Sequence, residues 1–529
     1  MANRTAIVLT GLGDVEESSA WGLIQPYYNT VESADEFVRP SAFANTALLT
    51  RWMDETQSVA EIFFTASGGG PSLTSGPGIY RATSSDQLRT WSTPVLVING
   101  TADPTFHGGV PWFVNAQNMG YNALTGEYLS LIYGGKAFAY PQSKFTSHGA
   151  LGFVLRSKNG LNWTCDGGFE IQYEGQSFPY CDLDRPTTID HDDGSMTFDQ
   201  FANQWVNVQI VIQNISTPTL PSGFELKDNS PGRRVVGFRT SNDDGHTWTC
   251  APSYLNGGNP FCGNKFNESS PVVLPLQTDP PELQVYRARP FRYFDRWVMA
   301  VYNYAPSPLC RETVSSCHGP HMGTSWWILP PGKDLANHTA WADQSSRNPY
   351  AWQRLWRQSR VLGPHEILNH NPLVISNKLI WFTKGRWVAV PDLRVAGLYS
   401  PANAQWVSKP FDLILGQKGI ALAIESDSQW QVPTSECDPL QELCQAYIMI
   451  EILAEKIDQH NASTWYVVPG FEMNKCIVKG LDTHRMVLKW RNATIEKSTA
   501  DLPTDITRIK LRVTMRDAVV YAFTFETIT

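Results

Sequence analysis

Residues 241–248 of this 529-residue chain read SNDDGHTW, and this stretch decides the fold. In such a turn, Asp243 accepts hydrogen bonds from backbone N–H groups, and Gly245 can adopt a conformation that other residues disfavour. Trp248 supplies a large ring that can pack between neighbouring sheets. The stretch therefore predicts a structural turn between two strands, and we assign it no catalytic role.

The same pattern, the Asp box seen in sialidase-like propellers, recurs along the chain. Copies read SSDQLRTW at 84–91 and SKNGLNW at 157–163, and a degenerate copy runs from GLYS at 397–400 to Trp406. A basic residue followed by a strand-like run precedes each copy, so the two signals alternate. Such alternation indicates radial repetition of four-stranded sheets. We predict an all-β chain with a β-propeller over residues 1–415, in which five repeats are readable.

Beyond residue 415 this repeat fades, although strands still follow one another. Apolar and polar residues alternate at 446–452, 486–490, 509–513 and 519–523. Such alternation suits two packed sheets. We therefore predict a β-sandwich-like region over residues 416–529, with continuation of the propeller as the alternative.

Cysteines and glycosylation sequons indicate a secreted, extracellular protein. Eight of the nine cysteines form close pairs in the sequence, namely Cys165/Cys181, Cys250/Cys262, Cys310/Cys317 and Cys437/Cys444. Because no Cys-x2-Cys spacing with matching histidines occurs, disulfides are favoured over zinc, and Cys476 is expected to be free. Eight Asn-x-Ser/Thr sequons agree with secretion, at Asn3, Asn99, Asn162, Asn214, Asn267, Asn337, Asn461 and Asn492.

Charge and hydropathy narrow the range of partners. The net charge is −8 and the sequence has no run of basic residues, which argues against a nucleic-acid partner. No apolar run approaches the roughly 18 residues of a membrane span. We expect a monomer that binds a carbohydrate substrate with uronate groups, without nucleic acid or membrane.

Basic residues at the expected starts of the inner strands are the candidate site residues. In a propeller these starts converge on the mouth of the central channel, and here they are Arg39, His107, Arg185, Arg289 and His370. A cationic ring on an acidic protein suggests an anionic ligand, and Arg can hold a carboxylate bidentately. The alternative for each residue is a structural role within its blade.

His107 is the candidate general base, because histidine can exchange protons near neutral pH and two glycines follow it. The two carboxylates that most glycosidases require are not visible at the strand starts. Acids cluster instead in Asp190-His191-Asp192-Asp193-Gly194, a solvated turn that could bind structural calcium. We expect no required cofactor.

The secreted profile, the basic strand starts and the stretch from Phe106 to Gly109 resemble the fungal L-rhamnose-α-1,4-D-glucuronate lyases, which trim gum arabic. That resemblance implies seven blades, a His-centred cationic site and release of a sugar such as rhamnose by β-elimination. In this mechanism Arg185 and Arg289 neutralise the uronate carboxylate and His107 is the base. The acid is His107 itself or His370.

Two other enzyme families and a binding module are alternatives. The boxes and Arg39-Pro40 resemble sialidases, in which case Arg39, Arg185 and Arg289 would hold a carboxylate. Invertase-like hydrolases pair a five-bladed propeller with a C-terminal sandwich, which resembles the layout predicted here. A lectin-like propeller would repeat one sugar pocket in several blades, whereas the candidate residues here differ between repeats.

Overall fold

The structure is a computed structural model that splits into two compact units, Thr30–Val390 and Met1–Asn29 with Pro391–Thr529. Within the described ranges, the only helical elements are the short 3-10 turns η5 (Met473–Lys475) and η6 (Thr499–Asp501), and no helix is long and apolar enough to cross a bilayer. The residues described are 6–9, 15–18, 25–28, 31–66, 78–99, 118–134, 150–165, 170–173, 176–179, 188–189, 194–200, 202–213, 233–245, 249–250, 271–273, 284–294, 296–304, 323–328, 353–354, 368, 370–412, 420–428, 446–457, 462–479, 481–492 and 495–527.

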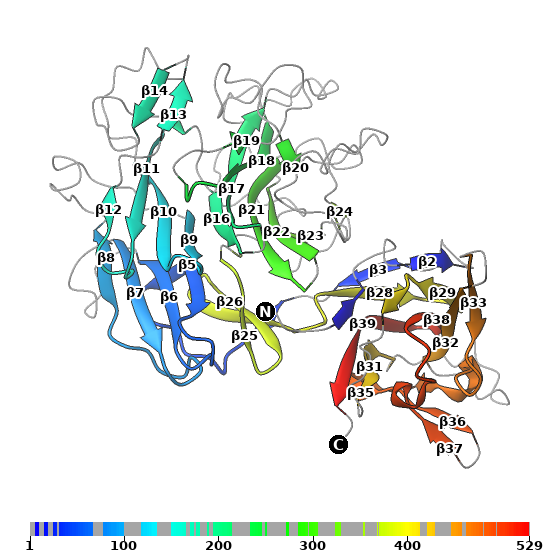
Figure 1. Cartoon of the computed structure of the whole chain (residues 1–529). Helices are drawn as coiled ribbons and strands as arrows, with labels where there is room; N and C mark the ends of the chain where they lie inside the picture. The colour runs from blue at the N-terminus through cyan, green and yellow to red at the C-terminus, as the bar shows by residue number, and fades with distance from the viewer. Residues whose placement is uncertain are drawn as a thin grey trace, which may run out of the picture. The chain divides into compact units, whose positions relative to one another are not determined.

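Unit Thr30–Val390 contains five antiparallel sheets, each with four strands in a row, which are the blades of a propeller (Figure 1). Blade one consists of β5 (Ala44–Trp52), β6 (Ala60–Ala66), β7 (Gly78–Ser84) and β8 (Val95–Asn99). Blade two consists of β9 (Asn118–Asn122), β10 (Glu127–Gly134), β11 (Ala150–Ser157) and β12 (Thr164–Cys165), with β15 (Thr188–Ile189) paired to β11.

The other three blades follow the same order. Blade three consists of β16 (Gly194–Asp199), β17 (Gln204–Gln213), β18 (Arg233–Ser241) and β19 (Thr249–Cys250), with β20 (Pro271–Val273) paired to β18. Blade four consists of β21 (Gln284–Tyr293), β22 (Arg296–Tyr304), β23 (Gly323–Ile328) and β24 (Gln353–Arg354). Blade five consists of β25 (Leu373–Ile375), β26 (Lys378–Thr383), β27 (Arg386–Pro391) and β4 (Glu32–Ser33).

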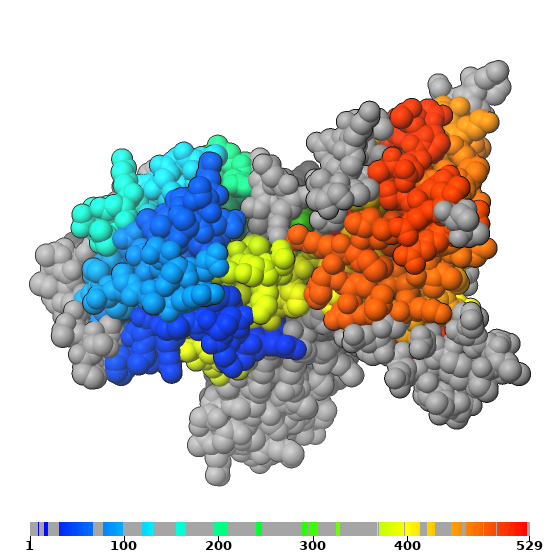
Figure 2. Space-filling model, turned by 90° about the horizontal axis from the view of Figure 1, so that it is seen from below, coloured from blue at the N-terminus to red at the C-terminus, as the bar shows by residue number. Residues whose placement is uncertain are grey.

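The propeller is closed by an early strand of the chain. Strand β4 pairs with β27, so residues from both ends of this unit build blade five. Figure 2 shows blade one in blue beside strands of blade five in yellow, and β26 contacts β5. Because the ring of blades is closed, blade five has a neighbouring blade on each face, and its apolar side chains are protected from water.

Strand β26 shows how a blade packs on both faces. Trp381 contacts Phe291 and Trp326 of blade four, with ring centroids 5.8 and 5.7 Å away. The next residue, Phe382, lies in a buried cluster that includes Ile62 of blade one. Successive side chains point to opposite faces of a strand, so both faces of β26 are apolar because both are covered.

The three full Asp boxes, the third of which is described only through Gly245, follow the third strand of a blade and form turns, as predicted. In the first, the Asp86 carboxylate accepts hydrogen bonds from the backbone N–H groups of Arg89 (3.1 Å) and Thr90 (2.9 Å). The hydroxyl and backbone N–H of Thr90 together hold the pKa of Asp86 down to about 2. In the third, the N–H of Gly245, whose φ is +84°, donates to Ser241 Oγ. These contacts are local, which supports a structural role.

The box tryptophans that the structure describes lie between blades. Trp91 stacks on Trp387 of blade five at 6.1 Å, and both indole N–H groups donate to the Val38 carbonyl. Trp163 of blade two makes an edge contact with Phe63 of blade one at 6.2 Å. Trp248, predicted to occupy the same type of position, lies outside the described residues.

The second unit is a two-sheet β-sandwich. One sheet has the order β3 (Gln25–Tyr28), β28 (Ala396–Ser400), β39 (Ala518–Thr527), β31 (Ile420–Asp427) and β35 (Asp482–Val487), with β1 (Ala6–Val8) on β39. The other has the order β2 (Val15–Ser18), β29 (Ala404–Ser408), β38 (Arg508–Arg516), β32 (Tyr447–Ile457) and β33 (Ser463–Val467), with β30 (Phe411–Asp412) on β38 and β34 (Ile477–Lys479) on β32.

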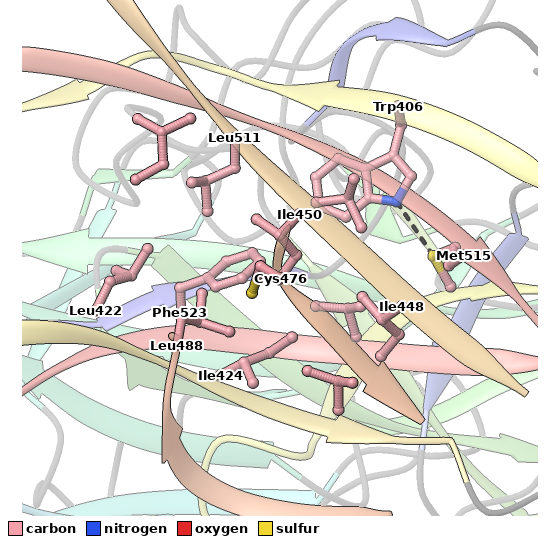
Figure 3. Close-up of a cluster of buried hydrophobic side chains, with 14 of the residues drawn as sticks. Trp406, Leu422, Ile424, Ile448, Ile450, Cys476, Leu488, Leu511, Met515 and Phe523 are labelled. Atoms are coloured by element: carbon pink, nitrogen blue, oxygen red, sulfur yellow. Dashed lines mark hydrogen bonds between the residues drawn. The ribbon is translucent and has the colours of Figure 1, made fainter. Parts of the chain in front are cut away.

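Side chains from both sheets form the sandwich core (Figure 3). Ile424 and Phe523 come from one sheet, and Ile448 and Ile450 come from the other. Cys476 is buried beside them and is a free thiol, as predicted. The eight cysteines predicted to form disulfides have no side chain among those described.

Three expectations about organisation are corrected. The sandwich begins at Pro391 rather than at residue 416, and it also takes residues 1–29. The degenerate copy from Gly397 to Trp406 belongs to β28 and β29 of the sandwich, where Trp406 is fully buried. The described strands of this unit form five blades, each with four strands in a row, rather than the seven blades that the lyase resemblance implies; β13 (Glu170–Tyr173) and β14 (Gln176–Pro179) form a separate two-stranded sheet.

Candidate functional site

The inner strands of the five blades, β5, β9, β16, β21 and β25, position the candidate site. Strand β9 contacts both β5 and β16, β21 contacts β16, and β25 contacts β5. Of the five predicted residues, His107 and Arg185 lie outside the described part of the chain. The structure describes Arg39, Arg289 and His370, and each has a different environment.

Arg39 is exposed on the segment that joins β4 to β5, before the inner strand begins. The preceding residue, Val38, is fixed by the indole N–H groups of Trp91 and Trp387, at 2.7 and 2.9 Å from its carbonyl oxygen. The backbone that carries Arg39 is therefore held between blades one and five, while its guanidinium remains accessible to an anionic solute.

Arg289 is in the interior of β21, not at a strand start, and its exposed fraction is only 1%. Its Nε donates to Asn371 Oδ1 of blade five at 3.3 Å. Burial lowers the pKa of Arg289 to about 9, which still leaves it charged at neutral pH. A substrate on the surface cannot reach this guanidinium, so its predicted contact with the sugar carboxylate is not supported.

His370 is fully buried, and both of its ring nitrogens are engaged. Nε2 accepts a hydrogen bond from the Phe382 backbone N–H at 2.9 Å, so the ring proton belongs on Nδ1. Nδ1 lies 2.7 Å from Thr50 Oγ1 and 2.8 Å from the Asn371 carbonyl oxygen. Burial lowers the pKa of His370 to about 4. These contacts are those of a structural histidine, which corrects its prediction as an acid.

Arg289 and His370 come from different blades and lie near one another in the buried interior, linked through Asn371. Thr50 of blade one, Arg289 of blade four and the His370-Asn371 pair of blade five meet through hydrogen bonds. Thr50 and Asn371 were not predicted. Asn371 stands directly between His370 and Pro372 in the sequence, but an asparagine next to a histidine is not a pattern that indicates a site residue.

The inner strands carry more cations than carboxylates. Their sequences contain four arginines, Arg51, Arg287, Arg289 and Arg292, and one acid, Asp199. Asp199 is the last residue of β16 and accepts a hydrogen bond from the Ala202 N–H at 3.4 Å. These strands therefore do not supply a pair of carboxylates.

A buried ionic cluster that the sequence did not reveal joins blades one and two. The Glu61 carboxylate is fully buried and pairs with Arg51 Nε at 2.8 Å and Arg81 Nε at 2.6 Å. Tyr128 of blade two donates its hydroxyl to Glu61 at 2.7 Å. Arg51 also lies 3.7 Å from the centroid of the Tyr121 ring. Each group has a partner, so this cluster is a structural joint.

A second joint connects blades two and three around Asp244. Its carboxylate accepts from Trp205 Nε1 at 2.7 Å and from Asn122 Nδ2 at 3.1 Å. Although burial opposes ionisation, these hydrogen bonds keep the pKa of Asp244 below its ordinary value. Burial, followed by the hydrogen bond to Asp244, raises the pKa of Glu127, which also pairs with Arg156 at 3.4 Å.

No group of three or more His, Cys, Asp or Glu side chains among those described could hold a metal ion. The acidic turn from Asp190 to Gly194, predicted to bind structural calcium, lies outside the described residues apart from Gly194, the first residue of β16.

No known family model matches the chain, and no curated protein matches it. Among solved structures, a β-fructofuranosidase of Bombyx mori in complex with sucrose has 10% identity and a TM-score of 0.35, covering 95% of this chain and 94% of that one. An exo-β-1,3-galactanase of Phanerochaete chrysosporium with β-1,3-galactotriose has 9% identity and a TM-score of 0.32, covering 94% and 100%.

A third solved structure is an ulvan lyase bound to a GlcA(1-4)Rha3S unit, with 11% identity and a TM-score of 0.29, covering 75% of this chain and 82% of that one. At these TM-scores the likenesses support no argument about function.

Proposed function

We propose that this protein is an extracellular carbohydrate-active enzyme that cleaves the bond to a uronic acid by β-elimination. The observation that carries the proposal is that the inner strands supply a single carboxylate, Asp199, while Arg39, on the segment before β5, is exposed. Hydrolysis in most glycosidases requires two carboxylates that flank the bond. Elimination requires cations and one proton-transfer group instead.

The structure changes the assignment of roles from the one expected from sequence. Arg39 is exposed and Arg289 is not, so Arg39 and Arg185 are proposed to pair with the uronate carboxylate. His370 has no nitrogen available, so His107 is proposed as both base and acid. Of these three proposed residues, only Arg39 lies in the described part of the chain.

The proposed reaction has one proton to move. Neutralisation of the carboxylate by arginine makes the C5 proton of the uronate acidic, and the His107 imidazole removes it. The electron pair left at C5 forms the C4–C5 double bond as the C4–O4 bond breaks. The imidazolium then returns the proton to O4, which leaves as a hydroxyl of the released sugar. Each cationic donor to the enolate-like intermediate is expected to contribute on the order of 100- to 1000-fold in rate.

The test is incubation with a rhamnosyl-glucuronate glycan while released rhamnose and ultraviolet absorbance are followed together. Elimination gives equal amounts of sugar and of an absorbing unsaturated uronate. The variant His107→Ala is expected to lose the activity, whereas the exposed sandwich residue His484, changed to Ala, is the matched control that retains it. Full activity of His107→Ala would falsify the assignment of the base.

Glycoside hydrolysis is the second candidate, because the five four-stranded blades followed by a sandwich match the invertase-like layout. A fold hosts many reactions, so the layout alone does not decide between them. Release of sugar without absorbance would identify a hydrolase and would direct attention to the acids around Asp190. Binding of several equivalent sugars per chain without turnover, measured by calorimetry, would identify a lectin-like propeller.

A further inference from the structure

Arg289 has no described acidic partner, unlike Arg51, Arg81 and Arg156 of the propeller. Arg51 and Arg81 share the Glu61 carboxylate, and Arg156 pairs with Glu127. Arg289 uses only Nε, toward an amide oxygen, and neither Nη1 nor Nη2 has a hydrogen-bond partner. Its exposed fraction is 1%, so water outside the protein does not solvate these two groups.

The described groups around Arg289 are neutral. The His370 ring is held with its proton on Nδ1 by the Phe382 N–H, and the low pKa of about 4 keeps it uncharged. The Thr50 hydroxyl is bonded to His370 and to the Asn371 carbonyl oxygen. Burial alone accounts for the lowered pKa of Arg289, with no contribution from a carboxylate. Among the described residues of blades one, four and five, no carboxylate therefore balances the positive charge at this point.

An isolated buried charge is strongly unfavourable unless an opposite charge or several hydrogen bonds accompany it. Arg289 does not escape this cost by losing its proton, because its pKa of about 9 lies above neutral pH and the guanidinium stays charged. A planar guanidinium with two unpartnered Nη groups presents N–H donors that suit an anion. Its burial favours a small anion over a carboxylate carried by a sugar.

We infer that the interior of the propeller holds a binding site for a small inorganic monovalent anion, such as chloride, on Nη1 and Nη2 of Arg289 between blades one, four and five. The site is independent of the proposed elimination, since Arg289 is not assigned to the substrate. The anion compensates the guanidinium and stabilises the contact of β21 with the His370-Asn371 segment.

The test measures thermal unfolding of the full-length protein at constant ionic strength while chloride replaces gluconate. A ligand that binds only the folded state raises the midpoint temperature of unfolding. Once the ligand concentration is above Kd, this rise is proportional to the logarithm of the concentration. We expect such a rise for the wild-type protein and none for Arg289→Met. The matched control Arg292→Met, on the same strand, is expected to keep the response to chloride.

A second measurement uses the wild-type protein and so does not require that any variant fold. A crystal soaked in bromide is expected to show an anomalous peak in contact with both Nη atoms of Arg289. Equal midpoints in chloride and gluconate, an undiminished rise in Arg289→Met, or a bromide-soaked crystal without this peak would overturn the inference. A rise caused by free glucuronate but not by chloride, and lost in Arg289→Met, would also overturn it and would identify a sugar carboxylate as the occupant.

Discussion

The buried Glu61 cluster allows a quantitative test of how blades one and two are joined. The substitution Glu61→Gln keeps the size of the side chain but removes the charge that pairs with Arg51 and Arg81. Glu61 accepts hydrogen bonds at both of its oxygens, so the side-chain amide N–H of the glutamine would face an N–H or O–H donor where an acceptor is needed. Both arginines then lose their only described carboxylate partner, while Tyr128 loses an anionic acceptor.

The expected cost is about 3 kcal/mol in the free energy of unfolding, at the lower end for a buried pair broken on one side. The lower end applies because Arg51 and Arg81 are 17% and 14% exposed and so are partly solvated. Urea denaturation followed by tryptophan fluorescence measures this cost as a shift of the propeller transition.

Glu36→Gln is the matched control. Glu36 also pairs with a cation, Lys378, at 2.6 Å, but the two side chains are 48% and 43% exposed. A solvated pair of this kind is worth about 1 kcal/mol at most. If Glu61→Gln costs no more than Glu36→Gln, the reasoning that the Glu61 cluster holds the two blades together is wrong.

Three further outcomes are expected. Burial raises the folded-state pKa of Glu127 above its unfolded value. Its contribution to stability is therefore fully present below the unfolded pKa and is lost as pH rises through the folded pKa, so Glu127→Gln should gain stability relative to wild type as pH rises through this range in thermal melts. A difference that does not change with pH would contradict this. Trp91→Ala should lower the free energy of unfolding by about 2 kcal/mol in urea titrations, less than for a fully buried ring, and no change would mean that the stack on Trp387 contributes nothing. Burial raises the pKa of Cys476 to about 12, so peptide mapping should find it alkylated only after denaturation, and rapid labelling of the folded protein would refute this.

Local patterns in the sequence were sufficient to predict the class of fold. The turn of the Asp box that begins at Ser241 forms through contacts within a few residues, so the sequence alone reveals it. The blade number and the domain boundary depend on pairing between distant strands, such as β4 with β27. The segment from Gly397 to Trp406 resembles a blade turn by composition, yet its strands pair with β39 and β38 of the sandwich.

The candidate site was harder to predict than the fold. The sequence indicated which basic residues belong near the inner strands, but not how deep each would lie. Arg289 and His370 are both buried, and their burial depends on neighbouring blades: β21 packs against blade three, and β25, which follows His370, packs against blade one. Their partners, Thr50 and Asn371, are ordinary polar residues whose role appears only when three blades meet.

The two-part sandwich has a consequence for the order in which the chain can fold during synthesis. Strands β1 to β3 leave the ribosome before the propeller, yet their partners β39, β29 and β28 follow it in the chain. The propeller unit, residues 30–390, is a continuous insertion between these two parts and can close before its host domain is complete. At roughly 5–20 residues per second, the early strands remain without their partners for tens of seconds. Unpaired strand edges invite association with other chains. Chaperone protection of the first 29 residues is therefore most needed while the propeller is being made.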